Sequence, residues 1–183
     1  ARSIDPSTGE LATWFCEPIG TRHREGRLVE SWQPAPLPEA AMDNARSIAA
    51  RIVGAMASCG IFSVEMFVSG DDVYFSQVTP RPSRDGLVTF VTQRINQFDL
   101  QARATQRLPI DSTLISPGAV RFLEGHPSQA ALAAAMAVEE VTVRMLGDGT
   151  LVLATADSAA EARQRTDEAV REIHKIDGKP GEN

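Results

Sequence analysis

Alternating apolar and polar residues predict a β-hairpin near the middle of the chain. The runs 61–68 and 73–78 each alternate with a period of two residues, and a Gly-Asp-Asp sequence at 70–72 separates them. Runs of this kind, rich in β-branched and aromatic residues, are typical of paired strands. Glu65 interrupts the apolar pattern of the first strand. Because burying an unpaired carboxylate is costly, we expect Glu65 to face either a cation ligand or an arginine across the sheet.

The chain before and after this hairpin predicts a mixture of strands and helices. Residues 38–58 carry apolar side chains at three- and four-residue spacing, as one face of an amphipathic helix does. Shorter elements are expected as strands at 1–4, 10–17, 22–24 and 27–32 and as helices at 87–91 and 98–107.

A second unit is expected to follow a cluster of Asp, Ser, Thr and Pro at 110–117. Gly147-Asp148-Gly149 predicts a tight hairpin turn, because Asp-Gly readily adopts positive φ. Ser158 and Glu161 have capping-box spacing at the start of a helix that Gly178 ends. This unit is expected to hold a strand at 118–123, a helix at 127–136, a hairpin of 138–146 with 150–155, and that last helix. The fold class is therefore α+β, with units at 1–109 and 110–183.

Composition and charge narrow the class of protein. The chain has 183 residues, 43% apolar and 23% charged, as an ordinary globular protein does. Its formal net charge of -6 argues against a nucleic-acid surface, which needs clustered Lys and Arg. No apolar run is long enough for a membrane span. Cys16 and Cys59 form neither a disulfide framework nor a metal-ligand motif, so a reducing cytoplasm is the expected location.

The central hairpin and its flanks resemble a known family. A strand with one glutamate, a turn, and a second strand running into Pro-Arg-Pro at 80–82 is similar to the metal-binding hairpin of ATP-grasp enzymes. With Glu-Ser-Trp-Gln-Pro at 30–34 and Leu-Val-Thr at 87–89, the chain most resembles the formate-dependent phosphoribosylglycinamide formyltransferases, from about Arg2 to about Ala156. The resemblance implies the C-terminal half of an ATP-grasp domain, an antiparallel sheet with helices, then a small β-rich unit closed by a helix. The family's N-terminal nucleotide-fold domain and ATP-covering subdomain have no counterpart here.

The resemblance also implies the site residues. The family places one metal-binding glutamate on each strand of the hairpin, and the matching positions here are Glu65 and Gln77. A further acid that contacts the glycinamide substrate matches Arg84, a reversal of charge, with Asp85 one residue away. The phosphate-binding Lys and Arg residues of the family's second hairpin match nothing between Met145 and Val152, where no basic residue occurs. ATP and Mg²⁺ are the implied cofactors of the parent family, and we expect this chain to bind neither tightly.

These departures set the functional expectation. The parent reaction is ATP- and Mg²⁺-dependent formylation of phosphoribosylglycinamide with formate, through formyl phosphate, in purine synthesis. We expect this chain to be a fragment or a degenerate or redesigned form that is inactive alone. Two alternatives stay open: a subunit completed by a separate ATP-binding chain, and a binding or assembly module that self-associates through an exposed sheet edge. A homo-oligomer is plausible in each case.

Overall fold

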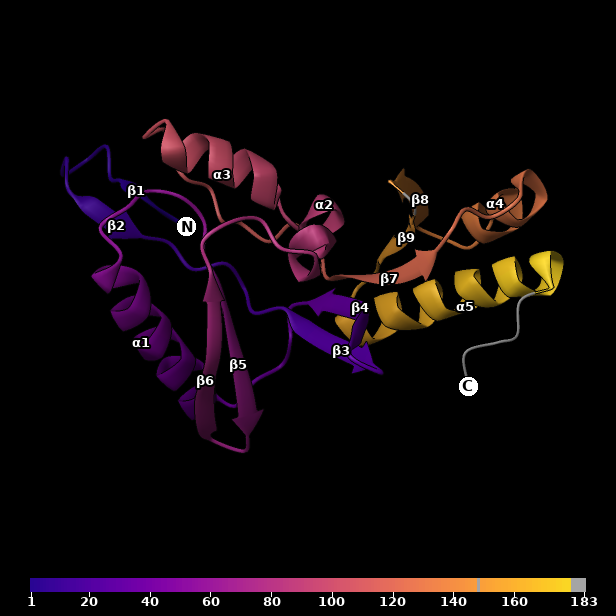
Figure 1. Cartoon of the computed structure of the whole chain (residues 1–183), viewed down its shortest axis with the longest axis horizontal. Helices are drawn as coiled ribbons and strands as arrows, with labels where there is room; N and C mark the ends of the chain where they lie inside the picture. Colours follow the sequence, from indigo (N-terminus) through magenta and orange to yellow (C-terminus); the bar gives the residue numbers. More distant parts are fainter. Residues whose placement is uncertain (148, 179–183) are drawn as a thin grey trace.

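The computed structural model describes residues 1–147 and 149–178, and it is α+β as the sequence predicts (Figure 1). Three antiparallel sheets form within these residues. Their strands are β1 (Arg2–Ile4), β2 (Leu11–Thr13), β3 (Gly20–Arg24), β4 (Arg27–Gln33), β5 (Ser63–Ser69), β6 (Asp72–Thr79), β7 (Gly118–Glu124), β8 (Val141–Leu146) and β9 (Gly149–Thr155). The helices are α1 (Glu39–Ala55), the 3₁₀ turn η1 (Asp85–Val88), α2 (Thr89–Thr92), α3 (Gln97–Thr105), α4 (Gln129–Met136) and α5 (Ala159–Asp177).

The largest sheet has the strand order β3-β4-β7-β9-β8. Its centre, β7 and β9, is almost wholly buried, since helices cover both faces. On one face α4 and α5 pack Ala135, Ala169 and Ile173 against β8 and β9. On the other face Val88 of η1 packs against residues of β7 and β9. This sheet joins strands from both sides of the boundary expected at 110–117, which itself stays a prediction.

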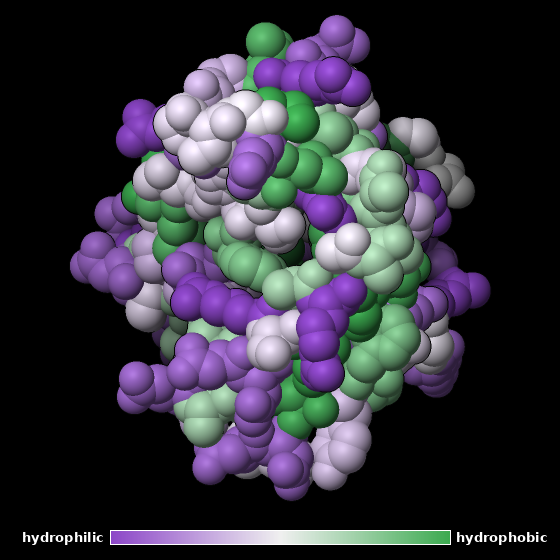
Figure 2. Space-filling view, turned by 90° about the vertical axis from the view of Figure 1, so that its left-hand side faces the viewer, coloured by the Kyte–Doolittle hydropathy of each residue, from purple (hydrophilic) through white to green (hydrophobic). Residues whose placement is uncertain are grey.

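The hairpin of β5 and β6 stands apart from that sheet, with α1 beside it (Figure 1). Its strands are paired from Ser63–Thr79 to Ser69–Asp72, so the predicted hairpin is confirmed. Most of its side chains are exposed, Phe67 and Tyr74 among them. On the adjoining end of the molecule, apolar patches lie between polar side chains (Figure 2).

The predicted elements occur, but several boundaries differ. The strand expected at 10–17 is limited to β2, which pairs antiparallel with β1. The helix expected at 38–58 is α1 and ends at Ala55. The predicted turn at 147–149 contains Asp148, which lies outside the described residues. No helix among the described residues is long and apolar enough to cross a bilayer.

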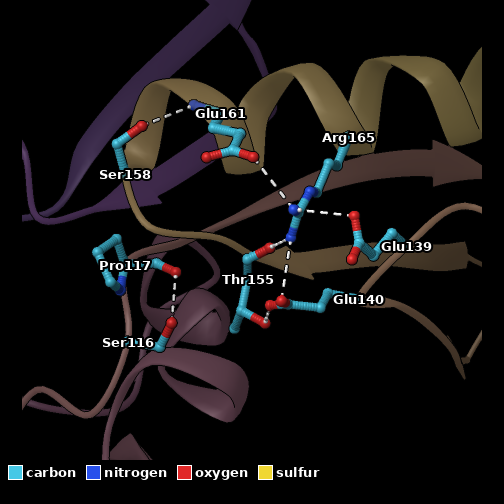
Figure 3. Close-up of polar contacts among 8 residues, drawn as sticks. All are labelled: Ser116, Pro117, Glu139, Glu140, Thr155, Ser158, Glu161 and Arg165. Atoms are coloured by element: carbon cyan, nitrogen blue, oxygen red, sulfur yellow. Dashed lines mark hydrogen bonds and ion pairs between the residues drawn. The ribbon is translucent and has the colours of Figure 1, made fainter.

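Arg165 joins the N-terminal part of α5 to the end of β9 in the main sheet (Figure 3). Ser158 caps the helix by accepting a hydrogen bond from the backbone N–H of Glu161 at 3.2 Å. The Glu161 side chain does not complete the predicted capping box but accepts from Arg165 at 3.1 Å. Arg165 also donates to the Thr155 carbonyl at 2.8 Å and lies 3.3 Å from the Glu140 carboxylate. These contacts hold α5 across the end of β9, which places the rest of the helix over the sheet.

Candidate functional site

One pocket of about 300 Å³ collects all four residues that the resemblance singled out: Glu65, Gln77, Arg84 and Asp85. Its walls are the β5–β6 hairpin, the segment 81–85 and strand β3. The start of β5 and the end of β6 lie together because the two strands pair antiparallel, and the segment 81–85 follows directly after β6. We call this space the hairpin pocket.

The two candidate metal ligands bind each other in the structure. Glu65 lies directly opposite Gln77 across the hairpin, and Gln77 Nε2 donates to Glu65 Oε2 at 2.7 Å. The register shifts between Glu65 and Met66, and Ser76 Oγ also donates to Glu65 at 3.4 Å. Bulges of this kind redirect side chains and are frequent beside functional sites.

The expectation that Glu65 is buried among apolar residues is wrong. Its side chain is exposed, because β5 and β6 form a sheet of their own instead of lying inside the larger one. Its hydrogen-bond partners are an amide and a hydroxyl, not the arginine considered as an alternative.

These groups do not fit a magnesium ion well. Magnesium is usually held by one or two carboxylates with phosphate oxygens and water. Here the amide nitrogen of Gln77 occupies one oxygen of the only carboxylate on the paired positions. No group of three or more His, Cys, Asp or Glu able to hold a metal occurs among residues 1–147 and 149–178.

Arg84 and Asp85 occupy the opposite wall of the hairpin pocket. Asp85 begins η1, and its Oδ2 accepts from Ser63 Oγ at 3.4 Å. Its backbone carbonyl accepts from Ser31 Oγ at 2.8 Å, which anchors η1 to β4. The Arg84 guanidinium lies over the Phe122 ring, 5.1 Å from its centroid. The pocket therefore contains a carboxylate next to the position where the family has one, with a cation at that position itself.

Sequence reasoning missed the part of the pocket that comes from β3. Thr21 and His23 of β3 line it. Their spacing of two residues places them on one face of a strand, which is the signal that could have found them. That β3 lies beside the hairpin depends on tertiary packing and has no local signature.

A buried carboxylate, that of Glu30, lies next to β3, the strand that contributes Thr21 and His23 to the hairpin pocket. Glu30 of β4 has no exposed surface, and Arg163 of α5 binds both its oxygens at 2.9 and 3.0 Å. Arg22 donates to Glu30 at 2.8 Å, and Arg163 also lies 4.0 Å from the centre of the Trp32 ring. Burial raises the pKa of the Glu30 carboxyl, but the hydrogen bond from Arg163 and the charges of Arg163, Arg22 and Arg121 outweigh burial and lower that pKa. The carboxylate is therefore ionised and holds β3, β4 and α5 together.

The second hairpin, β8 with β9, carries one basic side chain among its described residues, Arg144. Arg144 of β8 lies over the Phe90 ring at 4.9 Å. His126 approaches the hairpin from the preceding loop, with Nε2 3.2 Å from the Gly147 carbonyl. Neither position presents the paired basic groups that a phosphate would need here.

Comparison with known proteins identifies the fold family. The model of the ATP-grasp domain matches residues 4–98, more than half of the chain. The chain belongs to the ATP-grasp family. Within it, this ATP-grasp chain is 51% identical over 182 residues to the formate-dependent phosphoribosylglycinamide formyltransferase of Corynebacterium jeikeium. That match covers 92% of the chain but 44% of the relative, so the chain spans less than half the length of this relative.

Two solved structures superpose on the same ATP-grasp chain. The structure described as glycinamide-RNase-transformylase T from Mycobacterium tuberculosis superposes with a TM-score of 0.86 and 44% identity. The superposition covers 94% of this chain and 53% of the other chain. N5-carboxyaminoimidazole ribonucleotide synthetase from Thermus thermophilus superposes with a TM-score of 0.75 at 24% identity over 96% and 49% of the two chains, a likeness of fold alone.

Proposed function

We propose that this chain derives from an ATP- and Mg²⁺-dependent formyltransferase acting on phosphoribosylglycinamide, and that its own hairpin pocket does not support that reaction. The parent activity rests on the relative from Corynebacterium jeikeium, at 51% identity. The loss of activity rests on the contact between Gln77 and Glu65, because an amide nitrogen stands where a second metal-binding carboxylate is expected.

Two further residues support the loss of activity. The positive charge of Arg84 repels the amino group of a glycinamide substrate, which a carboxylate at that position would attract. Asp85 supplies a carboxylate to the same pocket but is tethered through Ser63. The second hairpin adds no basic donor between Met145 and Val152. Metal, amine and phosphate contacts are thus weakened together.

Complementation tests this proposal. The chain is mixed with the separately produced remaining part of the Corynebacterium jeikeium relative, and formate-dependent formylation of phosphoribosylglycinamide is assayed with Mg²⁺-ATP. We expect no turnover with the native chain. The variant Gln77→Glu, Arg84→Asp should give measurable turnover with a raised KM, because the phosphate donors are still absent. Glu65→Gln added to that variant should abolish the turnover, since it removes one of the two carboxylates at the paired metal-binding positions.

The matching segment of the relative itself is the positive control, because it shows that the two parts assemble. With that control active, turnover by the native chain would overturn the proposed loss of activity. It would support the alternative of a subunit completed by a separate ATP-binding chain.

A second candidate function is self-association through the β5–β6 hairpin. Phe67 is 64% exposed and Tyr74 58% exposed, at directly opposite positions of the two strands. Exposed aromatic pairs on a two-stranded sheet favour contact with another apolar surface. Light scattering over a range of concentrations would test this candidate: it predicts an oligomer that Phe67→Ser dissociates, whereas a native monomer would reject it.

A further inference from the structure

A second groove, of about 470 Å³, adjoins the hairpin pocket and is absent from the sequence expectations. It lies between the β3–β4 turn, the end of β7 and the second half of α5. Arg84 and Leu28 line both spaces. Its apolar surface comes from the half-buried side chains of Leu28, Val29, Leu123 and Pro127. We call it the basic groove, because Arg24, Arg27 and Arg84 line it.

Cations outnumber anions along its rim. Arg24 and Arg27 lie directly opposite each other at the end of the β3–β4 hairpin, and His174 of α5 lines the same groove. Glu25 and Glu124 are the acids of the same rim, and Glu124 forms an ion pair with Arg27. With Arg84, the three arginines of the lining exceed these two acids, so the groove carries an excess of positive charge.

Arg84 is the best-placed donor for such an anion. Its guanidinium carbon lies over the Phe122 ring, and no ion pair among the described residues includes Arg84. The N–H donors of a guanidinium lie in one plane, so two of them can bind two oxygens of a phosphate side by side. Half-buried Leu28 and Leu123 line the same groove and offer an apolar surface to the rest of a ligand.

We propose that the basic groove binds a phosphate monoester, with Arg84 holding the phosphate and Arg27 and Arg24 adding positive charge at the rim. The apolar surface of the groove takes the organic part of the ligand, which distinguishes an ester from a free anion. A nucleic-acid backbone fits less well, because the chain as a whole carries a net charge of -6. The proposal does not depend on whether the chain supports formyl transfer.

Calorimetric titration with phenyl phosphate at low ionic strength tests it, with phenol and inorganic phosphate titrated in parallel. We expect saturable binding of phenyl phosphate, no heat from phenol, and weaker binding of inorganic phosphate. Arg84→Gln should weaken binding by about tenfold or more, because it removes charge-assisted hydrogen bonds. Arg84→Lys should restore only part of the affinity, since an ammonium keeps the charge but not the paired donors.

Arg81→Gln is the matched control. Arg81 is exposed, lies three residues away and lines the hairpin pocket but not the basic groove. This change removes the same charge and should alter the affinity by less than about twofold. Equal losses in both glutamine variants would show non-specific attraction and overturn the proposal. Absence of binding, or equal affinity for inorganic phosphate, would also overturn it, provided that circular dichroism shows the native chain folded.

Discussion

Arg163→Met tests whether the buried Glu30 carboxylate holds the main sheet to α5. The change keeps an unbranched side chain against Trp32 but removes both hydrogen bonds to Glu30, at 2.9 and 3.0 Å. Arg22 then remains as the directly bonded cation. Because the carboxylate has no exposed surface, water cannot replace the lost donors.

The expected loss of stability is about 2–4 kcal/mol. Hydrogen bonds to charged groups contribute about 1.5–3 kcal/mol each, and breaking a buried ion pair costs about 3–5 kcal/mol. The expected loss is smaller than these contributions added together, because 36% of the Arg163 side chain is exposed and solvent screens part of the interaction. For a chain of this size the loss corresponds to a fall in Tm of roughly 5–15 °C.

Urea unfolding at two pH values provides the assay. The pKa of Glu30 is lowered in the native fold, so its contribution is present above the ordinary glutamate pKa of about 4.3 and is lost as pH falls through the lowered value. In the variant, protonation relieves the uncompensated charge. The stability gap between native chain and variant should therefore be full at pH 7 and narrow below pH ~4.

Arg171→Met is the control, because Arg171 lies on the same helix with an exposed side chain. It should change stability by less than about 0.5 kcal/mol. If Arg163→Met costs no more than Arg171→Met at pH 7, the ion pair does not stabilise the fold and the reasoning fails.

Three further substitutions probe the scaffold around the pocket. Gly20→Ala should cost about 1–3 kcal/mol, because its Cβ would lie 2.2 Å from the Trp32 ring; an unchanged Tm would show that the indole moves aside freely. Ser158→Ala should cost about 1 kcal/mol through loss of the α5 cap, and Ser158→Gly less, as thermal unfolding of the pair would show. Thr92→Val should cost about 1–3 kcal/mol, because it removes the 2.5 Å hydrogen bond to the buried Gln33 amide; urea unfolding equal to that of the native chain would contradict this.

Local sequence patterns predicted the elements of this fold better than their assembly. The period-two runs of β5 and β6 and the apolar stripe of α5 are properties of neighbouring residues, so they were predictable. The pairing of β4 with β7 joins residues about 90 positions apart and depends on burial that no local pattern reports. The exposure of Glu65 was missed for the same reason, because it depends on which sheet the hairpin joins.

The candidate site was predictable only through resemblance. Glu65 and Gln77 follow from the hairpin register, since a strand pair fixes which side chains are opposite. Arg84 was identified as a lost acid, but its stacking on Phe122 requires β7 to lie beneath it. The basic groove combines the β3–β4 turn with α5, whose side chains are separated by some 150 residues.

Calorimetric titration of the native chain and of Gln77→Glu with Mn²⁺, as a reporter for Mg²⁺, tests the central claim most directly. The account predicts that Gln77→Glu binds the ion at least about tenfold more tightly than the native chain. A second carboxylate then replaces the Gln77 amide that donates to Glu65. Glu65→Gln in that variant should remove the binding. Equal affinity of the native chain and of Gln77→Glu, lost in both on Glu65→Gln, would show that Gln77 is compatible with a working metal site and would contradict the account.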